Sequence, residues 1–172
     1  MATTHRAIMI SFLLLLPLAL AAYETVPQEK KTEVVIEGMV YCQSCDNYGS
    51  WSLSKAESIA AAKVSVVCKN QRGQVSFYKV FETDTKGYFF AELEGFKMSN
   101  SLWDHPLQSC VVKLVGSPLE SCNVMSNVNY GLYGSPLRYE SKMLYRKDYD
   151  VVIYAAGPLA FRPAQCPAPT HY

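Results

Sequence analysis

Six cysteines constrain the fold of this chain more than any other feature. In an exported chain an even number of cysteines predicts disulfides, whereas in a reducing compartment the same residues indicate metal or redox chemistry. The six are Cys42, Cys45, Cys68, Cys110, Cys122 and Cys166. The compartment of the chain therefore decides how they are interpreted.

The first 22 residues have the pattern of a cleavable secretion signal. Arg6 supplies a positive charge, residues 8–20 form an apolar run, and Ala19-Leu20-Ala21 provides small residues for cleavage after Ala21 or Ala22. The run is shorter than the roughly 20 apolar residues that span a bilayer, and no later run reaches that length. We therefore expect a secreted protein with no membrane insertion after signal cleavage.

Secretion divides the chain into four predicted segments: a signal peptide over 1–22, a flexible leader over 23–32, a six-cysteine β-domain over 33–167 and a short tail over 168–172. Removing 22 of the 172 residues leaves 150, which suits one domain. The removed segment holds one of the 16 basic residues and none of the 15 acidic ones, so the mature chain is formally neutral. A neutral chain predicts no nucleic-acid partner, because phosphate binding needs a basic face.

The pair Cys42-x-x-Cys45 has an alternative interpretation as a metal or redox site. A structural zinc site needs about four ligands, and the sequence has no second Cys-x-x-Cys and no paired histidines. A thioredoxin-like pair would begin a helix, but residues 46–50 (Asp-Asn-Tyr-Gly-Ser) are typical of a loop. We therefore expect structural disulfides, no metal and no cofactor.

The spacing of Cys42 and Cys45 restricts their partners. In an extended chain, residues three apart are roughly 10 Å apart and face opposite ways. The Cα atoms of a disulfide lie within about 7 Å of each other. The two cysteines should therefore bridge to different partners, which leaves the choice among the 15 connectivities of six cysteines otherwise open.

Short β-branched and aromatic runs between turn residues predict a β-rich fold. The predicted strands cover 34–42, 63–68, 74–83, 88–93, 108–115, 142–145 and 150–154. Residues 84–87 predict a tight turn that makes a hairpin of the two strands around it, and Gly38 predicts a bulge or a close backbone approach.

The remaining segments predict little regular structure. We expect at most one or two helical turns over 55–62, a long loop over 122–141 and an irregular segment over 157–169. The fold class is therefore all-β: a single disulfide-stapled antiparallel β-barrel or β-sandwich of about six to eight strands with long loops.

Catalytic constellations are absent from the sequence. There is no Gly-x-Ser-x-Gly elbow, phosphate-binding glycine loop or His-Glu-x-x-His motif. Glu92 and Glu94 could suggest a carboxylate pair, but two residues apart on a strand they are more typical of a solvated face. His105, before Pro106, is typical of a surface loop. We therefore expect no catalytic residues and no enzyme.

Loop aromatic residues are the candidate binding residues. Exposed aromatic rings stack on sugar faces, and tyrosine suits wet binding surfaces. The alternative is that these rings cover the ends of the barrel as part of the core. The candidate carbohydrate-binding residues are Tyr48, Trp51, Trp103, Tyr130, Tyr133 and Tyr139.

A basic cluster is a second candidate for binding, this time of an acidic glycan. Acidic residues interleave with it, which favours a solvated surface of mixed charge. The cluster consists of Arg138, Lys142, Arg146 and Lys147, and the interleaved acids are Glu140, Asp148 and Asp150.

Four segments resemble the olive-pollen major allergen (Ole e I-type) and extensin-like family of plants. They are Glu37-Gly-Met-Val-Tyr-Cys-Gln-Ser-Cys45, Ala62-Lys-Val-Ser-Val-Val-Cys68, Thr83-Asp-Thr-Lys-Gly-Tyr-Phe89, and Gly157-Pro-Leu-Ala-Phe-Arg-Pro163 followed by Cys166. The resemblance runs from about residue 33 to 167. Gln43 and Asp46 depart from the family pattern, which often has Asp and Arg there, and the long proline- or histidine-rich arm of many members is absent.

The resemblance implies a secreted β-barrel-like domain with the pairs Cys42–Cys122, Cys45–Cys166 and Cys68–Cys110. It also implies a non-enzymatic protein of the cell wall or extracellular matrix, in growing tissue or pollen. The expected partner is a wall polysaccharide, pectic or arabinogalactan, or a wall glycoprotein. The alternative is a secreted protein-binding ligand or regulator of a receptor or wall enzyme. We expect a monomer.

Overall fold

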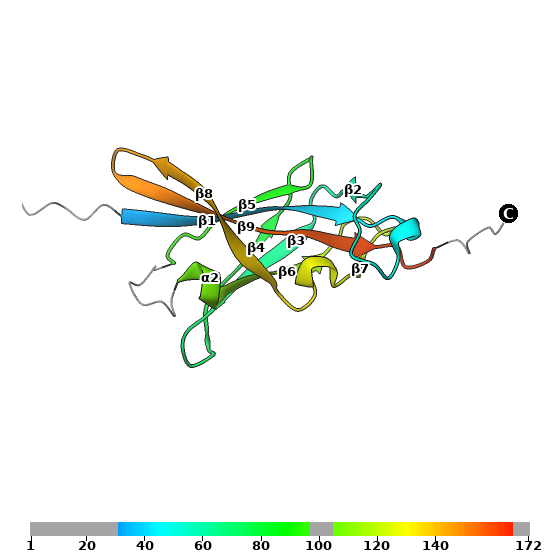
Figure 1. The fold of residues 1–172 in the computed structure, drawn as a ribbon, viewed down its shortest axis with the longest axis horizontal. Coiled ribbons are helices and arrows are strands. Elements are labelled where there is room, and N and C mark those ends of the chain that lie inside the picture. Colours follow the sequence, from blue (N-terminus) through cyan, green and yellow to red (C-terminus); the bar gives the residue numbers. More distant parts are fainter. Residues whose placement is uncertain (1–30, 97–104, 167–172) are drawn as a thin grey trace, which may run out of the picture. The chain divides into compact units, whose positions relative to one another are not determined.

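The computed structural model describes residues 31–96 and 105–166, all within one compact unit that begins at Lys31. The predicted all-β class is confirmed, because strands dominate these residues (Figure 1). The three short helical turns within this described part of the chain are η2 (Cys45–Asn47), α2 (Pro106–Ser109) and η4 (Val128–Tyr130). The strands are β1 (Lys31–Cys42), β2 (Glu57–Ser58), β3 (Lys63–Lys69), β4 (Val75–Glu82), β5 (Tyr88–Glu92), β6 (Cys110–Gly116), β7 (Val124–Met125), β8 (Ser135–Tyr145) and β9 (Tyr149–Arg162).

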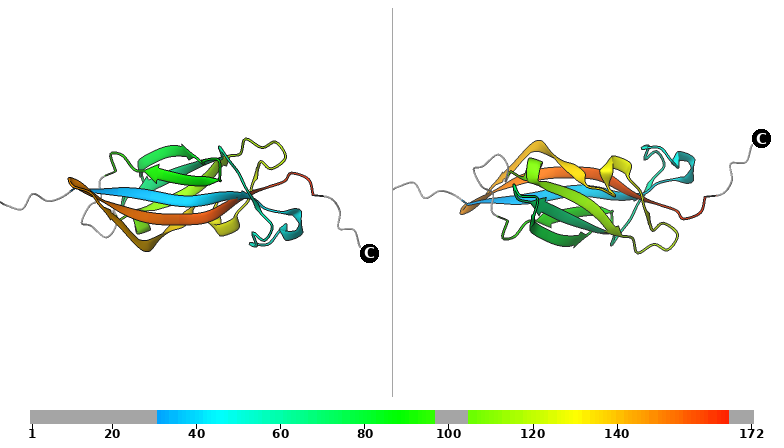
Figure 2. Two further views of the ribbon diagram at one scale, coloured as in Figure 1. Left: turned by 90° about the horizontal axis from the view of Figure 1, so that it is seen from above. Right: turned by 90° about the horizontal axis from the view of Figure 1, so that it is seen from below.

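The strands form one curled sheet, in the order β2-β1-β9-β8-β6-β3-β4, while β5 also pairs with β1 and β7 with β9. The sheet is mixed rather than wholly antiparallel, because β1 and β9 run side by side in the same direction (Figure 2). It is also no closed barrel: among the described residues, β4 forms a ladder only with β3, and β5 only with β1. The parallel pair could not be foreseen from local patterns, since its partners lie more than 100 residues apart.

Strand β9 lies at the centre of this arrangement. Residues 151–157 are all buried, since β1 and β8 flank them on either side. The expectation of an irregular segment after Gly157 was wrong as far as Arg162, because the strand continues to that residue and pairs with both β1 and β7. Pro158 is tolerated there because it is exposed, and its carbonyl accepts a hydrogen bond from Asn129 Nδ2 at 2.8 Å.

The predicted hairpin between β4 and β5 forms only its turn. Asp84 Oδ1 accepts hydrogen bonds from the backbone N–H groups of Lys86 and Tyr88, at 2.8 and 2.9 Å. Beyond this turn the two strands take different partners, so the hairpin expectation was wrong. The predicted helical turns over 55–62 do not form either, because Lys55 and Ala61 have positive φ and residues 57–58 pair with β1 as β2.

Gly38 has both features predicted for it. The register between β1 and β9 shifts between Gly38 and Val40, which marks an irregularity of the bulge type. A Cβ atom at Gly38 would lie 2.5 Å from the carbonyl oxygen of Ala156 and 2.6 Å from the Phe89 ring. Only glycine fits this contact.

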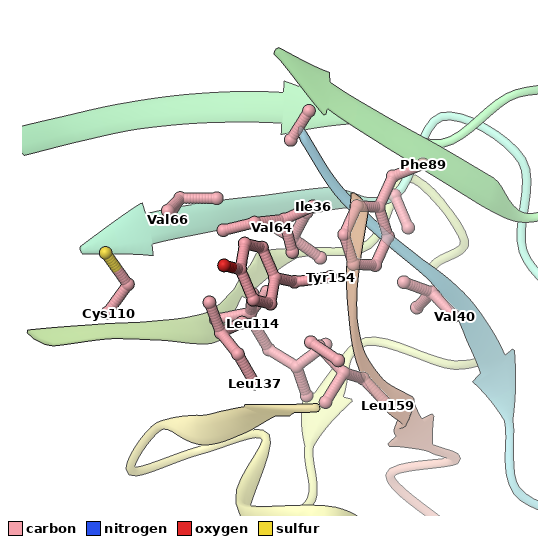
Figure 3. Packing of buried hydrophobic residues seen from close by; sticks show 14 of the residues in the cluster. Ile36, Val40, Val64, Val66, Phe89, Cys110, Leu114, Leu137, Tyr154 and Leu159 are labelled. Carbon is pink, nitrogen blue, oxygen red and sulfur yellow. The ribbon is translucent and has the colours of Figure 1, made fainter. Parts of the chain in front are cut away.

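One face of the sheet packs around a continuous core (Figure 3). Ile36, Phe89 and Leu159 are fully buried, and the Tyr154 ring lies among the aliphatic side chains labelled in Figure 3. The alternation predicted for the second strand holds, with Val64 and Val66 in this core. Alternate residues of β3 and β6 therefore project from the other face, where the candidate site lies.

All six cysteines form disulfides: Cys42–Cys122, Cys45–Cys166 and Cys68–Cys110. These are the pairs that the family resemblance implies, and Cys42 and Cys45 have different partners. Within residues 31–96 and 105–166, no group of three or more His, Cys, Asp or Glu side chains could hold a metal ion. None of the helices in the same residues is long and apolar enough to cross a membrane.

Candidate functional site

The aromatic candidates separate into three places on the molecule. Five of the six lie in the described residues and are substantially exposed, while Trp103 lies outside them. They do not form one continuous binding surface.

The first place is the end of the sheet where two disulfides join the loops. The Trp51 and Tyr130 rings meet edge to face with their centroids 5.1 Å apart, and the Arg162 guanidinium lies 4.7 Å from the centre of the Tyr48 ring. These contacts hold the rings in place while leaving about half of each side chain exposed, between 50% and 56%. This end offers exposed ring faces for stacking.

The second place is the ring of Tyr139. It lies 5.8 Å from the Tyr154 ring, which in turn meets His105 edge to face at 5.9 Å. Tyr154 is buried in the core, and its burial, with a smaller effect from Tyr139, raises the pKa of its phenol. The Tyr139 ring, in a residue that is 48% exposed, therefore also contacts a core residue.

The third place is a hollow on the outer face of β3 and β6, which we call the β3–β6 groove. It has a volume of about 650 Å³ and combines an apolar floor, an aromatic wall and several amide and amine groups. Tyr133 is the one aromatic residue among the described residues that line it. The lining residues are Val67, Lys69, Asn70, Gln71, Gly73, Gln108, Ser109, Val111, Lys113 and Tyr133.

Tyr133 is positioned by a loop that is fastened to β6. The backbone N–H of Leu114 donates to the carbonyl of Gly131 at 2.9 Å, and the N–H of Gly134 donates to that of Tyr130 at 2.7 Å. Gly134 has a φ of +138°, and a Cβ atom there would lie 2.9 Å from Val111, so only glycine lets the loop approach the strand so closely. The Tyr133 ring nevertheless remains 72% exposed beside the groove.

The opposite rim of the groove is the turn between β3 and β4. Asn70 Oδ1 accepts hydrogen bonds from the backbone N–H groups of Arg72 and Gln74, both at 3.0 Å. The Cys68–Cys110 disulfide links β3 to β6 at the positions next to Val67 and Val111, which line the groove. Turn, strands and disulfide together form a fixed base, so the groove is formed before any ligand arrives.

A polar cluster on the outer face of β1, β5 and β8 was missed by sequence reasoning. Glu37 Oε1 accepts from Lys142 Nζ at 2.5 Å, and Glu37 Oε2 accepts from the Tyr88 hydroxyl at 2.7 Å. Burial raises the pKa of the Glu37 carboxyl, but these two hydrogen bonds and the charge of Lys142 outweigh it, so the pKa lies below its usual value. Burial is the largest cause that raises the pKa of Tyr88, and the hydrogen bond to Glu37 is the second.

The same contacts decide the character of the predicted basic cluster. Lys142 pairs with Glu140 at 3.5 Å as well as with Glu37, and Arg138 pairs with Glu140 at 3.7 Å. The interpretation as a mixed-charge surface therefore fits these two basic residues better than a site for an acidic glycan. The only signal for Glu37 in the sequence was its place as the acidic first residue of the segment from Glu37 to Cys45 that resembles the family.

The fold and the groove define a class of small disulfide-bonded β-domain with fixed surface loops. No protein-family model matches the chain. Non-classical arabinogalactan protein 30 of Arabidopsis thaliana is 32% identical over 143 residues, which are 80% of this chain and 55% of the relative. The pistil-specific extensin-like protein of Nicotiana tabacum is 35% identical over 104 residues, 60% of this chain and 22% of the relative.

A pollen allergen and a solved structure extend the comparison. The major pollen allergen Lig v 1 of Ligustrum vulgare is 31% identical over 101 residues, 58% of this chain and 63% of the allergen. The crystal structure of the major plantain pollen allergen Pla l 1 has the same fold, with a TM-score of 0.55 and 22% identity over 81% of this chain and 99% of that one.

The chain belongs to the Ole e 1-like pollen allergen and extensin-like family of plants, which includes non-classical arabinogalactan proteins. It spans about half of the arabinogalactan relative, 55%, and 22% of the extensin-like one. The family consists of plant extracellular and cell-wall proteins, and none of the relatives' names denotes an enzyme.

Proposed function

We propose that this chain is a non-enzymatic, secreted protein of the plant extracellular matrix that binds wall polysaccharide or wall glycoprotein in the β3–β6 groove. The observation that supports this most directly is the position of Tyr133, which is 72% exposed at the edge of a hollow lined by amide and amine groups. Secretion after removal of residues 1–22 belongs to the same proposal. N-terminal sequencing of the secreted protein tests it, with Ala22 or Tyr23 expected as the first residue.

The groove suits a sugar for physical reasons. The C–H face of a pyranose ring stacks on an aromatic ring, while its hydroxyl groups need donors and acceptors around the edge. Tyr133 supplies the ring, the side chains of Asn70 and Gln108 supply amides, and Val67 with Val111 supplies an apolar floor. The family membership supports the same proposal, because relatives include arabinogalactan and extensin-like wall proteins.

Replacing the Tyr133 ring tests this function. We expect Tyr133→Ala to weaken binding to wall oligosaccharides about tenfold, which corresponds to the loss of one aromatic stacking contact. Tyr145→Ala is the matched control, because Tyr145 is 73% exposed but lies outside the groove. Both variants are titrated with pectic and arabinogalactan oligosaccharides by calorimetry, and a common thermal midpoint shows that both remain folded.

Two results would contradict the proposal. One is an absence of binding to any pectic or arabinogalactan oligosaccharide by the oxidised wild-type protein. The other is an equal loss of binding in Tyr133→Ala and Tyr145→Ala, since the groove would then have no special part in it. Sedimentation of the same samples tests the accompanying proposal that the protein is a monomer.

One observation favours a second function, the binding of another protein. In β8, Tyr139 and residues 142–145 pair with β9 on one side, while the β8 ladder with β6 includes only Ser135 and Pro136. The other edge of residues 139–145 has no strand partner among the described residues, and such an edge can accept an added strand. Capture from wall extracts that survives glycanase digestion would favour this protein ligand, and loss of capture would favour the sugar.

A further inference from the structure

We infer that the β3–β6 groove selects sugars that carry a carboxylate, that is, uronic acid residues within an oligosaccharide. This inference rests on the proposed function and adds the chemical class of the ligand. It comes from the charges in the groove, since Lys69 and Lys113 line it and none of the acidic residues that the structure describes does.

The two groove lysines differ from most other lysines of the molecule. Neither has a carboxylate partner among the described residues. The lysines that do have a carboxylate partner, at 2.5–3.6 Å, are Lys31, Lys55, Lys63, Lys79 and Lys142. The groove therefore combines an apolar floor with positive charge that the described residues leave uncompensated.

The register of the sheet separates these two charges along the groove. Val67 lies opposite Val111, and Ser65 lies opposite Lys113. Lys113 is therefore the next residue of β6 after Val111 that points to the same outer face. Alternate residues of a strand share a face, so Lys69 is the next residue of β3 after Val67 on the outer face. It lies on the opposite side of the valine pair from Lys113. Strand geometry puts the two lysine Cα atoms roughly 14 Å apart.

This spacing favours a chain of sugars over a single sugar. A monosaccharide on the valine floor can reach one ammonium group, whereas an oligomer that follows the groove can place a carboxylate near each. Tyr133 then stacks on one of the rings between them. A neutral oligosaccharide of the same length would cover the lysines without neutralising them, and discrimination arises from that difference in binding free energy.

Uronic acids reach a wall protein from two sources. One is the linear galacturonate chain, and the other is the glucuronate residue on otherwise neutral glycans such as arabinogalactans. The groove chemistry is the same for both. The experiment therefore includes both sources as separate ligands, together with a ligand in which the charge alone is removed.

The test is a titration of the oxidised protein with three probes at low and high salt. The probes are an oligogalacturonide, the same oligomer as its full methyl ester, and a glucuronate-bearing arabinogalactan oligosaccharide. We expect the free acid to bind more tightly than the ester, about two- to fivefold for each lysine engaged, and salt to remove that difference. Tighter binding of the third probe than of a glucuronate-free analogue would assign the site to arabinogalactan.

Charge-removing variants connect this selectivity with the groove. Lys69→Gln/Lys113→Gln should bring the affinity for the free acid to that of the ester. Lys63→Gln/Lys86→Gln also removes two positive charges, but from residues outside the groove, and should preserve the difference in affinity between acid and ester. Lys69→Arg/Lys113→Arg keeps the charge and should preserve it as well.

Each outcome decides between the two claims. Equal binding of acid and ester by the wild-type protein, with binding still lost in Tyr133→Ala, overturns the uronate selectivity and leaves the glycan function standing. Binding of none of the probes overturns both. A selectivity that survives in Lys69→Gln/Lys113→Gln overturns the assignment to these two lysines.

Discussion

At the scale of a single residue, Glu37 shows that side-chain contacts join the strands in addition to the backbone hydrogen bonds of the ladders. Its side chain is only 15% exposed, and its two oxygens contact residues from β5 and β8. A carboxylate in this position depends on its partners, because burial alone would favour its protonated form. The cluster therefore links three strands through one charge.

We expect Lys142→Met to lower the free energy of unfolding by about 1–2 kcal/mol at neutral pH, since it removes the cation from a largely buried carboxylate. Lys55→Met is the control, because both members of its pair with Asp46 are more than 70% exposed and should contribute almost nothing. Urea unfolding of both variants measures the difference.

The pH dependence of this difference follows from the lowered pKa of Glu37. The stabilisation is present above the ordinary carboxyl pKa of 4.5 and is lost as the pH falls through the lower pKa of the folded state. Wild type and Lys142→Met should therefore converge in stability below that folded-state pKa. A difference that stayed constant down to acid pH would contradict the role given to this charge.

At the scale of the elements, the parallel ladder between β1 and β9 is the axis of the fold. It runs from the pair Lys31 and Tyr149 to the pair Cys42 and Phe161, with a register shift after Gly38. Lys31 and Thr32, placed in the leader by the sequence, already belong to this ladder. The contact of Gly38 with Ala156 lets the two backbones approach at the shift.

Gly38→Ala should destabilise the fold by about 2–3 kcal/mol, because the new methyl group would overlap a backbone oxygen and a buried ring that cannot easily move. Gly116→Ala is the matched control, since a Cβ atom there meets nothing within 4 Å. Thermal melts of both variants provide the comparison. Equal midpoints would show that β1 and β9 can separate at no cost.

The elements also show what the sequence could predict. Strands with strong local alternation, such as β3 with Val64 and Val66 inside, were found close to their observed bounds. Their partners were not, because ladder pairing is decided by contacts across the whole chain. The long β9 was cut short in the prediction because Gly157 and Pro158 resemble a break, and only burial between two neighbouring strands carries the chain through them.

The candidate site was predictable only in part. Tyr133 was among the six aromatic candidates, but the same pattern also selected Tyr139, which packs against the core. The amides and lysines of the groove carry no motif, since they come from two strands, one turn and the short helix α2, which only the fold brings together. Glu37 and Lys142 are 105 residues apart, and the irregularity in β8, where Ser141 has a φ of +57°, aligns Lys142 with the outer face.

At the scale of the whole molecule, three disulfides close sequence separations of 42, 80 and 121 residues. The chain-entropy estimate for closures of this length is about 4–5 kcal/mol each, as an upper figure. Two of these bonds fix the loops at one end of the sheet, and the third fixes the base of the groove. The scaffold and the candidate site therefore depend on the same bonds.

We expect reduction of all three disulfides to lower the thermal midpoint strongly and to abolish oligosaccharide binding. The measurement is a melt and a titration with and without reductant, while a thiol assay counts six free cysteines in the reduced sample. A midpoint that did not change once all six thiols were free would refute the structural role of these bonds.

The Cys45–Cys166 bond also determines how the domain would carry tension. A force applied at Lys31 and Cys166 would travel along β1 and the few residues after it, cross this bond and leave, so that residues 46–165 would bear no load. In the reduced protein the same force would act in shear on the parallel β1–β9 ladder, where many hydrogen bonds must break together. Under oxidising conditions and strain, one disulfide would thus make the folded domain an inextensible link and shield the β3–β6 groove from the pull.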